Sequence, residues 1–185
     1  MPAPLDSFDD VAPALHRLHA LPVPVADALR HWRGTVPAEE VLHVETDPRW
    51  ADTDAFVEHY GAELLPFSAN CVVVAGKRGG ESTLAACLVP SAARVDVNGT
   101  VRRQLGARKA SFAAMDTATG LTGMEHGGIT PVGLPADWAL LVDPRLLDLT
   151  HVLLGSGLRR GKLIMPGKAL AELPGAVLVD GLGRA

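Results

Sequence analysis

The spacing of apolar residues predicts short helices and strands in the first part of the chain. Residues 8–21 (FDDVAPALHRLHAL) and 52–64 (DTDAFVEHYGAEL) have helical apolar spacing, and the acidic residues at their starts suit helix capping. Gly61 is placed to end the second helix. Between the two helices, residues 41–45 (VLHVE) predict a short strand.

A β-hairpin is expected over residues 71–89. This segment (CVVVAGKRGGESTLAACLV) consists of two apolar runs joined by a Gly-rich turn centred near Gly79. Residues equidistant from that centre pair across the strands, so Cys71 is expected to lie opposite Cys87. Because the chain has no CxxC pair, we interpret both cysteines as small apolar core residues.

The rest of the chain continues the irregular alternation of short elements. The expected elements are a helix from Asp96 to Gly106, a strand at 109–113, a helical turn or two from Asp116, a strand at 138–143, a helical turn at 144–148, strands at 151–157 and 162–165, a helix at 166–173 and a strand at 176–180. This order favours a mixed α+β domain over a strict βαβ repeat.

Residues 126–135 (HGGITPVGLP) form a glycine-rich loop between a helix and a strand. Adjacent glycines allow positive φ and close approach of another molecule, while Pro131 biases Thr130 toward an extended conformation. Such a loop can direct several N–H groups at one oxygen, as in an anion site or oxyanion hole. A simple tight turn is the alternative reading.

Length and composition limit the class of protein. A chain of 185 residues fits one domain, or one domain with an N-terminal extension. No apolar run is long enough for a membrane span, and the first ten residues are acidic where a signal peptide would be basic, so a soluble cytoplasmic protein is expected. The seven histidines lack metal-site spacing, and we expect neither a metal nor a cofactor.

Charge is distributed unevenly. Residues 1–70 carry 12 acidic and 4 basic side chains, whereas residues 71–185 carry 9 acidic and 13 basic ones. The basic residues form two clusters, which would suit a polyanion such as tRNA if they share a face: Arg102, Arg103, Arg108 and Lys109, and Arg159, Arg160 and Lys162. Ordinary solvated charge is the alternative.

Several motifs in order resemble the YbaK-like family, whose domain is also inserted in some bacterial prolyl-tRNA synthetases. They are LGARK, the D…TG turn, GGITPVG, the VD strand end and the GSG strand end, and the match runs over about residues 51–180. The resemblance implies a mixed, partly barrel-like sheet flanked by short helices. It further implies an editing domain over 51–185, with residues 1–50 as an N-terminal extension packing on it.

The resemblance also implies an activity. Members of this family hydrolyse the ester that joins a wrong amino acid to its tRNA, and here a small amino acid is expected. Backbone N–H groups of Gly127, Gly128 and Ile129 would face the substrate carbonyl, and the ribose hydroxyl of the tRNA would help activate water. The partners implied are aminoacyl-tRNA and an aminoacyl-tRNA synthetase; the sequence does not indicate an oligomeric state.

Further residues are candidates for binding the substrate: Thr130, Pro131, His126, Asp143, Ser156 and Gly157. His126 is either a base or a surface or capping residue, and Asp143 is either a pocket ligand or a helix cap. A simple turn is the alternative for Ser156 and Gly157.

Asn70 departs from the family pattern. It occupies the place of a family lysine at the start of the hairpin and is a candidate catalytic residue, because an amide can hydrogen-bond to the substrate although it cannot supply a full positive charge. A binding module of the same fold with impaired catalysis is therefore the alternative function. A small-molecule phosphate binder that uses GSGLRRG is a third hypothesis.

Overall fold

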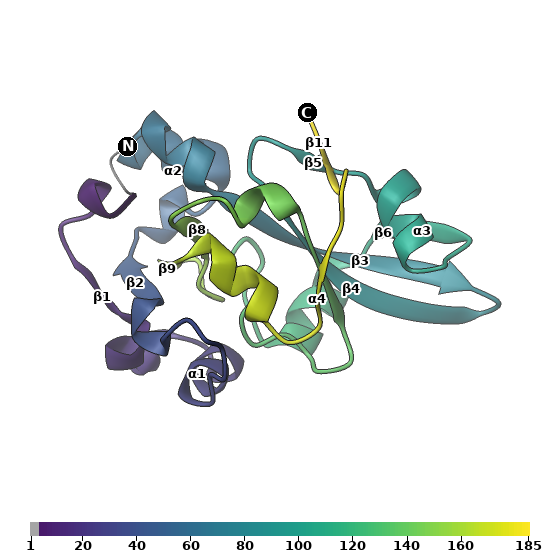
Figure 1. Cartoon of the computed structure of the whole chain (residues 1–185), viewed down its shortest axis with the longest axis horizontal. Coiled ribbons are helices and arrows are strands. Elements are labelled where there is room, and N and C mark those ends of the chain that lie inside the picture. Colours follow the sequence, from purple (N-terminus) through teal and green to yellow (C-terminus); the bar gives the residue numbers. More distant parts are fainter. Residues whose placement is uncertain (1–3) are drawn as a thin grey trace.

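The computed structural model describes residues 4–185, whose strands form two large sheets and a small one (Figure 1). The first sheet is antiparallel, with the order β1 (Val11–Pro13), β2 (Leu42–Glu45), β9 (Gly161–Met165) and β8 (Val152–Gly155). The second is mixed, with the order β10 (Ala176–Leu178), β7 (Ala139–Val142), β4 (Glu81–Pro90), β3 (Ala69–Arg78) and β6 (Lys109–Phe112). The small sheet pairs β5 (Arg94–Val95) with β11 (Gly183–Arg184).

The helices are short. The α-helices are α1 (Val23–Arg30), α2 (Thr53–Tyr60), α3 (Arg102–Gln104) and α4 (Met115–Thr122). The 3-10 helices are η1 (Pro4–Ser7), η2 (Ala14–Ala20), η3 (Ala38–Glu40), η4 (Pro48–Trp50), η5 (Ala62–Phe67), η7 (Pro144–Leu146) and η8 (Gly167–Glu172), and η6 (Val97–Val101) is a π-helical turn. The predicted α+β class is confirmed. Among residues 4–185 no helix has the length and apolar character that a membrane span requires.

Within residues 4–185, one β-bridge links the two large sheets. An isolated parallel bridge joins Ser68, just before β3, to Leu153 in β8. The expected sheet was partly barrel-like. This bridge is the one strand-to-strand link between the two large sheets, and the strands of residues 4–185 do not close into a barrel. The start of β3 therefore lies beside β8, the edge strand of the other sheet.

The five-stranded sheet is apolar on both faces. Along β4, Ala86 and Leu88 belong to the main core, whereas Cys87 and Val89 belong to a second cluster with Val179 of the C-terminal segment. This alternation follows from the two-residue period of a strand. The hairpin is consequently buried on both sides near its base.

Residues from the N-terminal part of the chain belong to the first large sheet and to the main core. Strand β2 pairs with β9, and Val25, Ala26 and Leu29 of α1 are buried in the main core. Residues 4–50 thus supply strands and core side chains that pack with elements from the C-terminal part of the chain.

The predicted helix over 8–21 is wrong. Strand β1 and the 3-10 helix η2 occupy this segment instead. Pro13 explains the difference, because it lacks an N–H donor and has an extended ψ of 131°, which is incompatible with a continuous helix. The other expected elements are present, with ends that differ by a few residues and with 3-10 geometry in η8.

The predicted pairing of the two cysteines is also wrong, by one residue. Cys71 lies opposite Leu88, and Cys87 lies opposite Val72, because the turn is centred between Gly79 and Gly80. A shift of one residue moves a side chain to the other face of the sheet. The two thiols therefore lie in different clusters, and burial raises the pKa of the Cys87 thiol to about 12.

Candidate functional site

A cavity of about 500 Å³ lies beside the junction of the two large sheets. Its walls come from residues 51–53 and 69–73, with Phe112, Ala113, Met115, Ala118, His126, Gly127, Ile129, Gly155 and Lys162. Small apolar side chains form part of the wall, among them Ala51, Ala69 and Ala118. This volume is typical of a pocket for a small organic ligand.

The glycine loop forms one wall of this cavity and is a tight turn. The N–H of Gly128 donates to the carbonyl oxygen of Glu125 at 3.0 Å, and Gly127 has a φ of 79°, in the left-handed region that favours glycine. The turn is fixed to the end of β8, because the N–H of Gly157 donates to the carbonyl oxygen of Gly128 at 2.7 Å.

Close contacts between backbone segments explain why glycine occupies positions 128 and 155. A Cβ at Gly128 would lie 2.8 Å from the carbonyl carbon of Leu158, and a Cβ at Gly155 would lie 2.5 Å from the carbonyl oxygen of Gly128. A side chain at either position would therefore separate the loop from the strand end.

The expected role of Gly128 as an oxyanion donor does not fit this geometry. Its N–H is already used inside the turn, and the residue does not line the cavity. Gly127 and Ile129 do line the cavity, and no hydrogen bond within residues 4–185 uses their N–H groups. Two of the three expected donors thus have no hydrogen-bond partner within residues 4–185.

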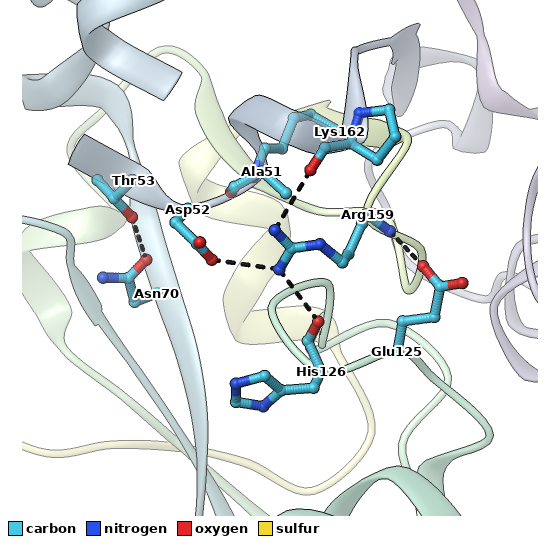
Figure 2. A network of polar contacts seen from close by, with 9 residues as sticks. Ala51, Asp52, Thr53, Asn70, Glu125, His126, Arg159 and Lys162 are labelled. Atoms are coloured by element: carbon cyan, nitrogen blue, oxygen red, sulfur yellow. Dashed lines mark hydrogen bonds and ion pairs between the residues drawn. The ribbon is translucent and has the colours of Figure 1, made fainter. Parts of the chain in front are cut away.

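Arg159 connects the glycine turn to the segment before α2 (Figure 2). Its guanidinium contacts the carboxylate of Asp52 at 3.3 Å and donates to the carbonyl oxygens of His126 (3.5 Å) and Pro48 (3.2 Å). Its backbone N–H donates to the Glu125 carboxylate at 2.7 Å. Arg159 is therefore a structural bridge beside the cavity rather than a free contact for tRNA.

Lys162 also differs from its expected role on a basic surface, because it lines the cavity. Its Nζ donates to the carbonyl oxygen of Ala51 at 3.0 Å and lies 4.9 Å from the centre of the Phe56 ring. Burial and the charge of Arg159 lower the pKa of this ammonium to about 8, against the opposing influence of Asp52.

Asn70 and His126 line the same cavity. The Oδ1 of Asn70 accepts hydrogen bonds from the hydroxyls of Thr53 (2.9 Å) and Ser91 (3.3 Å). The carbonyl oxygen of His126 faces the guanidinium of Arg159, whereas its imidazole is directed away from that guanidinium (Figure 2).

The other expected substrate-binding residues lie outside the cavity wall. Thr130 and Pro131 are buried residues of the loop itself, and Gly157 packs against Pro22. The hydroxyl of Ser156 donates to the carbonyl oxygen of Leu158 at 3.1 Å.

Asp143 is a helix cap rather than a ligand of the cavity. Its carboxylate caps η7 and accepts hydrogen bonds from Arg145 and from the N–H of Gly183. Burial alone would raise the pKa of this carboxyl, but these hydrogen bonds outweigh it and the pKa lies below its usual value.

The GSGLRRG segment is unsuited to binding a phosphate through its backbone. Three of its amides are already used: Gly157 donates to Gly128, Leu158 to the hydroxyl of Ser156, and Arg159 to Glu125. An anion would also meet the carboxylate of Glu125 at this position. These three amides therefore do not support the phosphate-binder hypothesis.

The basic residues of the first cluster do gather at one end of the molecule. Arg102, Arg103, Arg108 and Lys109 are exposed on α3, on β6 and in the segment between them, beside the tip of the β3–β4 hairpin (Figure 1). Lys77 pairs with Lys109 across the strands. The second cluster does not share this surface as a unit, because Arg159 and Lys162 are engaged at the cavity and only Arg160 is exposed.

The position of Lys162 could have been found from strand alternation. In β9, Leu163 and Met165 belong to the main core, while Ile164 packs with Phe56 under α2. Lys162 lies two residues before Ile164 and so points to the same covered side. The run RRGK suggested a solvated charge cluster and obscured this pattern.

Comparisons with known proteins give a consistent result. The family model of the aminoacyl-tRNA editing domain matches residues 47–173. A crystal structure described as a candidate trans-editing enzyme for prolyl-tRNA synthetase has a TM-score of 0.70 at 25% identity, covering 88% of this chain and 96% of that one.

Two more distant structures share the fold alone. A hypothetical protein has a TM-score of 0.66 at 22% identity, covering 77% of this chain and 90% of its own. A candidate signal transduction protein from Marinobacter aquaeolei VT8 has a TM-score of 0.52 at 19% identity, covering 89% of this chain and 31% of its own. No curated protein matches the chain in sequence.

Proposed function

Because this chain belongs to the aminoacyl-tRNA editing domain family, we propose that it is a trans-editing deacylase that releases a small, wrongly attached amino acid from tRNA. The related structure described as acting for prolyl-tRNA synthetase supports a similar link between this chain and a synthetase. The substrate is then an aminoacyl ester on the terminal ribose of a tRNA.

The observation that carries the proposal is the cavity wall at Gly127 and Ile129. Both N–H groups are unused within residues 4–185, and both residues border a cavity with small apolar walls. An aminoacyl ester is already activated, so a site has to hold it, stabilise charge on the carbonyl oxygen and admit water. One well-placed donor contributes about 3–4 kcal/mol to such a transition state.

The reaction balances without a protein nucleophile. Water adds to the ester carbonyl carbon, the bond between that carbon and the ribose oxygen breaks, and the ribose oxygen leaves with a proton as a hydroxyl group. The products are a free amino acid and an uncharged tRNA. The ribose hydroxyl next to the ester is our candidate for the group that directs the water.

Incubation with a panel of mischarged tRNAs tests this function. The protein should release the amino acid from at least one tRNA that carries a small amino acid, faster than the ester hydrolyses alone. Ala113→Phe should block release because Ala113 lines the cavity. Ala114→Phe is the matched control, since Ala114 is exposed and outside the cavity wall.

A non-catalytic binding module is the second candidate. It is favoured by Asn70, whose carbonyl oxygen is held by Thr53 and Ser91 and which brings no charge to the cavity. This candidate predicts tight binding of the same tRNAs with no release of amino acid, in the wild type and in Ala114→Phe alike.

A further inference from the structure

One side chain of the cavity wall, that of Lys162, is positively charged and has no role in the reaction described above. The ammonium of Lys162 reaches the wall from β9, with one hydrogen bond to the carbonyl oxygen of Ala51 and with the ring of Phe56 beneath it. These two contacts fix the position of Nζ. An ammonium has three N–H donors, so two remain for other partners.

No carboxylate within residues 4–185 forms an ion pair with Lys162. The acid nearest in its effect is Asp52, whose carboxylate contacts Arg159 at 3.3 Å. A largely buried charge without a counter-ion is unfavourable unless another group compensates it. The cavity next to Nζ is where a ligand oxygen with negative charge would fit.

We infer that Lys162 is a catalytic residue of this cavity, whose ammonium donates a hydrogen bond to the acyl carbonyl oxygen of the substrate. The inference rests on the proposed function. When water adds to the carbonyl carbon, the electron pair of the C=O bond moves to this oxygen, and the adjacent ammonium offsets the negative charge. The carbonyl re-forms as the ribose oxygen leaves, and Lys162 keeps its proton throughout.

The protonation state of Lys162 fits this role. A pKa of about 8 leaves the ammonium mostly protonated at neutral pH. The charged groups that face it are Asp52, from the segment before α2, and Arg159, from the turn between β8 and β9. His126 and Cys71 share the cavity.

The variant Lys162→Met tests the inference, because methionine preserves the apolar packing on Phe56 and removes the charge. Release of amino acid in a single turnover should slow by about 100-fold or more, with tRNA affinity little changed. Lys168→Met, at an exposed lysine outside the cavity, should react like the wild type. For the wild type, the ratio of catalysed to uncatalysed rate should fall above pH 8, where Lys162 loses its proton. In Lys162→Arg this fall should begin at a higher pH, because a guanidinium stays protonated.

A second measurement separates this inference from the proposed function. The chain has four lysines, so the 15Nζ signal of Lys162 can be followed while adenosine carrying a 3′-amide-linked small amino acid is added. If the signal shifts although no charged tRNA is hydrolysed, the deacylase function is wrong and the binding role stands. If tRNA is hydrolysed while Lys162→Met keeps the wild-type rate and the signal does not move, the inference is wrong and the function stands.

Discussion

The N–H of Gly157 donates to the carbonyl oxygen of Gly128 at 2.7 Å, which joins the glycine loop to the end of β8. The loop is thus held on the strand end by its backbone, without a side chain between them. This contact sets the position of the cavity wall that Gly127 and Ile129 form.

Replacing Gly128 should disrupt this contact. In Gly128→Ala the new methyl group would meet the backbone of Leu158 at 2.8 Å, and we expect the free energy of unfolding to fall by about 1–3 kcal/mol. Gly120→Ala is the matched control, because that position in α4 has open space and alanine favours helix, so stability should rise by about 0.5–1 kcal/mol. Urea denaturation measures the free energy of unfolding of both variants. If Gly128→Ala unfolds with the wild-type free energy, the close packing of Gly128 on Leu158 is refuted.

Arg159 should matter for stability more than its exposed neighbour. Arg159→Met removes hydrogen bonds to Asp52, His126 and Pro48, and we expect a loss of about 1–2 kcal/mol, mostly from the two carbonyl contacts since the ion pair is partly exposed. Arg160→Met should change stability by less than about 0.5 kcal/mol. Equal effects of the two substitutions in thermal unfolding would argue against the bridge.

The carboxylate of Asp143 should stabilise the fold in a pH-dependent way. Its pKa is lowered from an unfolded value of about 3.8, so the ionised group contributes stability above that pH and loses it as the pH falls through the lower folded pKa. At pH 7, Asp143→Asn should lower the free energy of unfolding by about 1–3 kcal/mol, and the gap to wild type should narrow below about pH 3.8. A gap that stays constant with pH would contradict this.

Exposed Asp137 provides the control for that series. It makes no side-chain hydrogen bond among residues 4–185, so Asp137→Asn should follow the wild type at every pH.

The basic end formed by α3, β6 and the hairpin tip is our proposed tRNA surface. The double variant Arg108→Gln, Lys109→Gln should bind tRNA more weakly, and the slope of log affinity against log salt should fall by about one for each phosphate that the variant no longer neutralises. Arg33→Gln, which removes an exposed charge after α1, serves as the control. If all three proteins bind tRNA equally in a salt series, tRNA binds elsewhere.

Local signals predicted most of the elements, because capping and glycine act over a few residues. Asp96 caps η6 through the N–H groups of Gly99 and Thr100, and Gly61 ends α2, as their positions in the sequence indicate. The register of the hairpin was missed by one residue because a turn centre can lie on a residue or between two.

The candidate site was harder to predict, since it depends on tertiary partners. The sequence indicated the loop but not that Gly128 uses its N–H within its own turn. Arg159 and Lys162 read as one basic surface, whereas the turn before β9 takes Arg159 to Asp52 and strand alternation takes Lys162 into the cavity. Such differences follow from contacts between segments distant in sequence.

The central claim is that the cavity beside Gly127 and Ile129 holds the acyl end of an aminoacylated adenosine. Backbone amide NMR spectra, recorded while the amide-linked analogue is added, test it most directly. The account predicts the largest saturating shifts at the N–H groups of Gly127 and Ile129. Largest shifts beside Glu45, Asp47 and Arg160, which line a second cavity, with Gly127 and Ile129 unmoved, would contradict it.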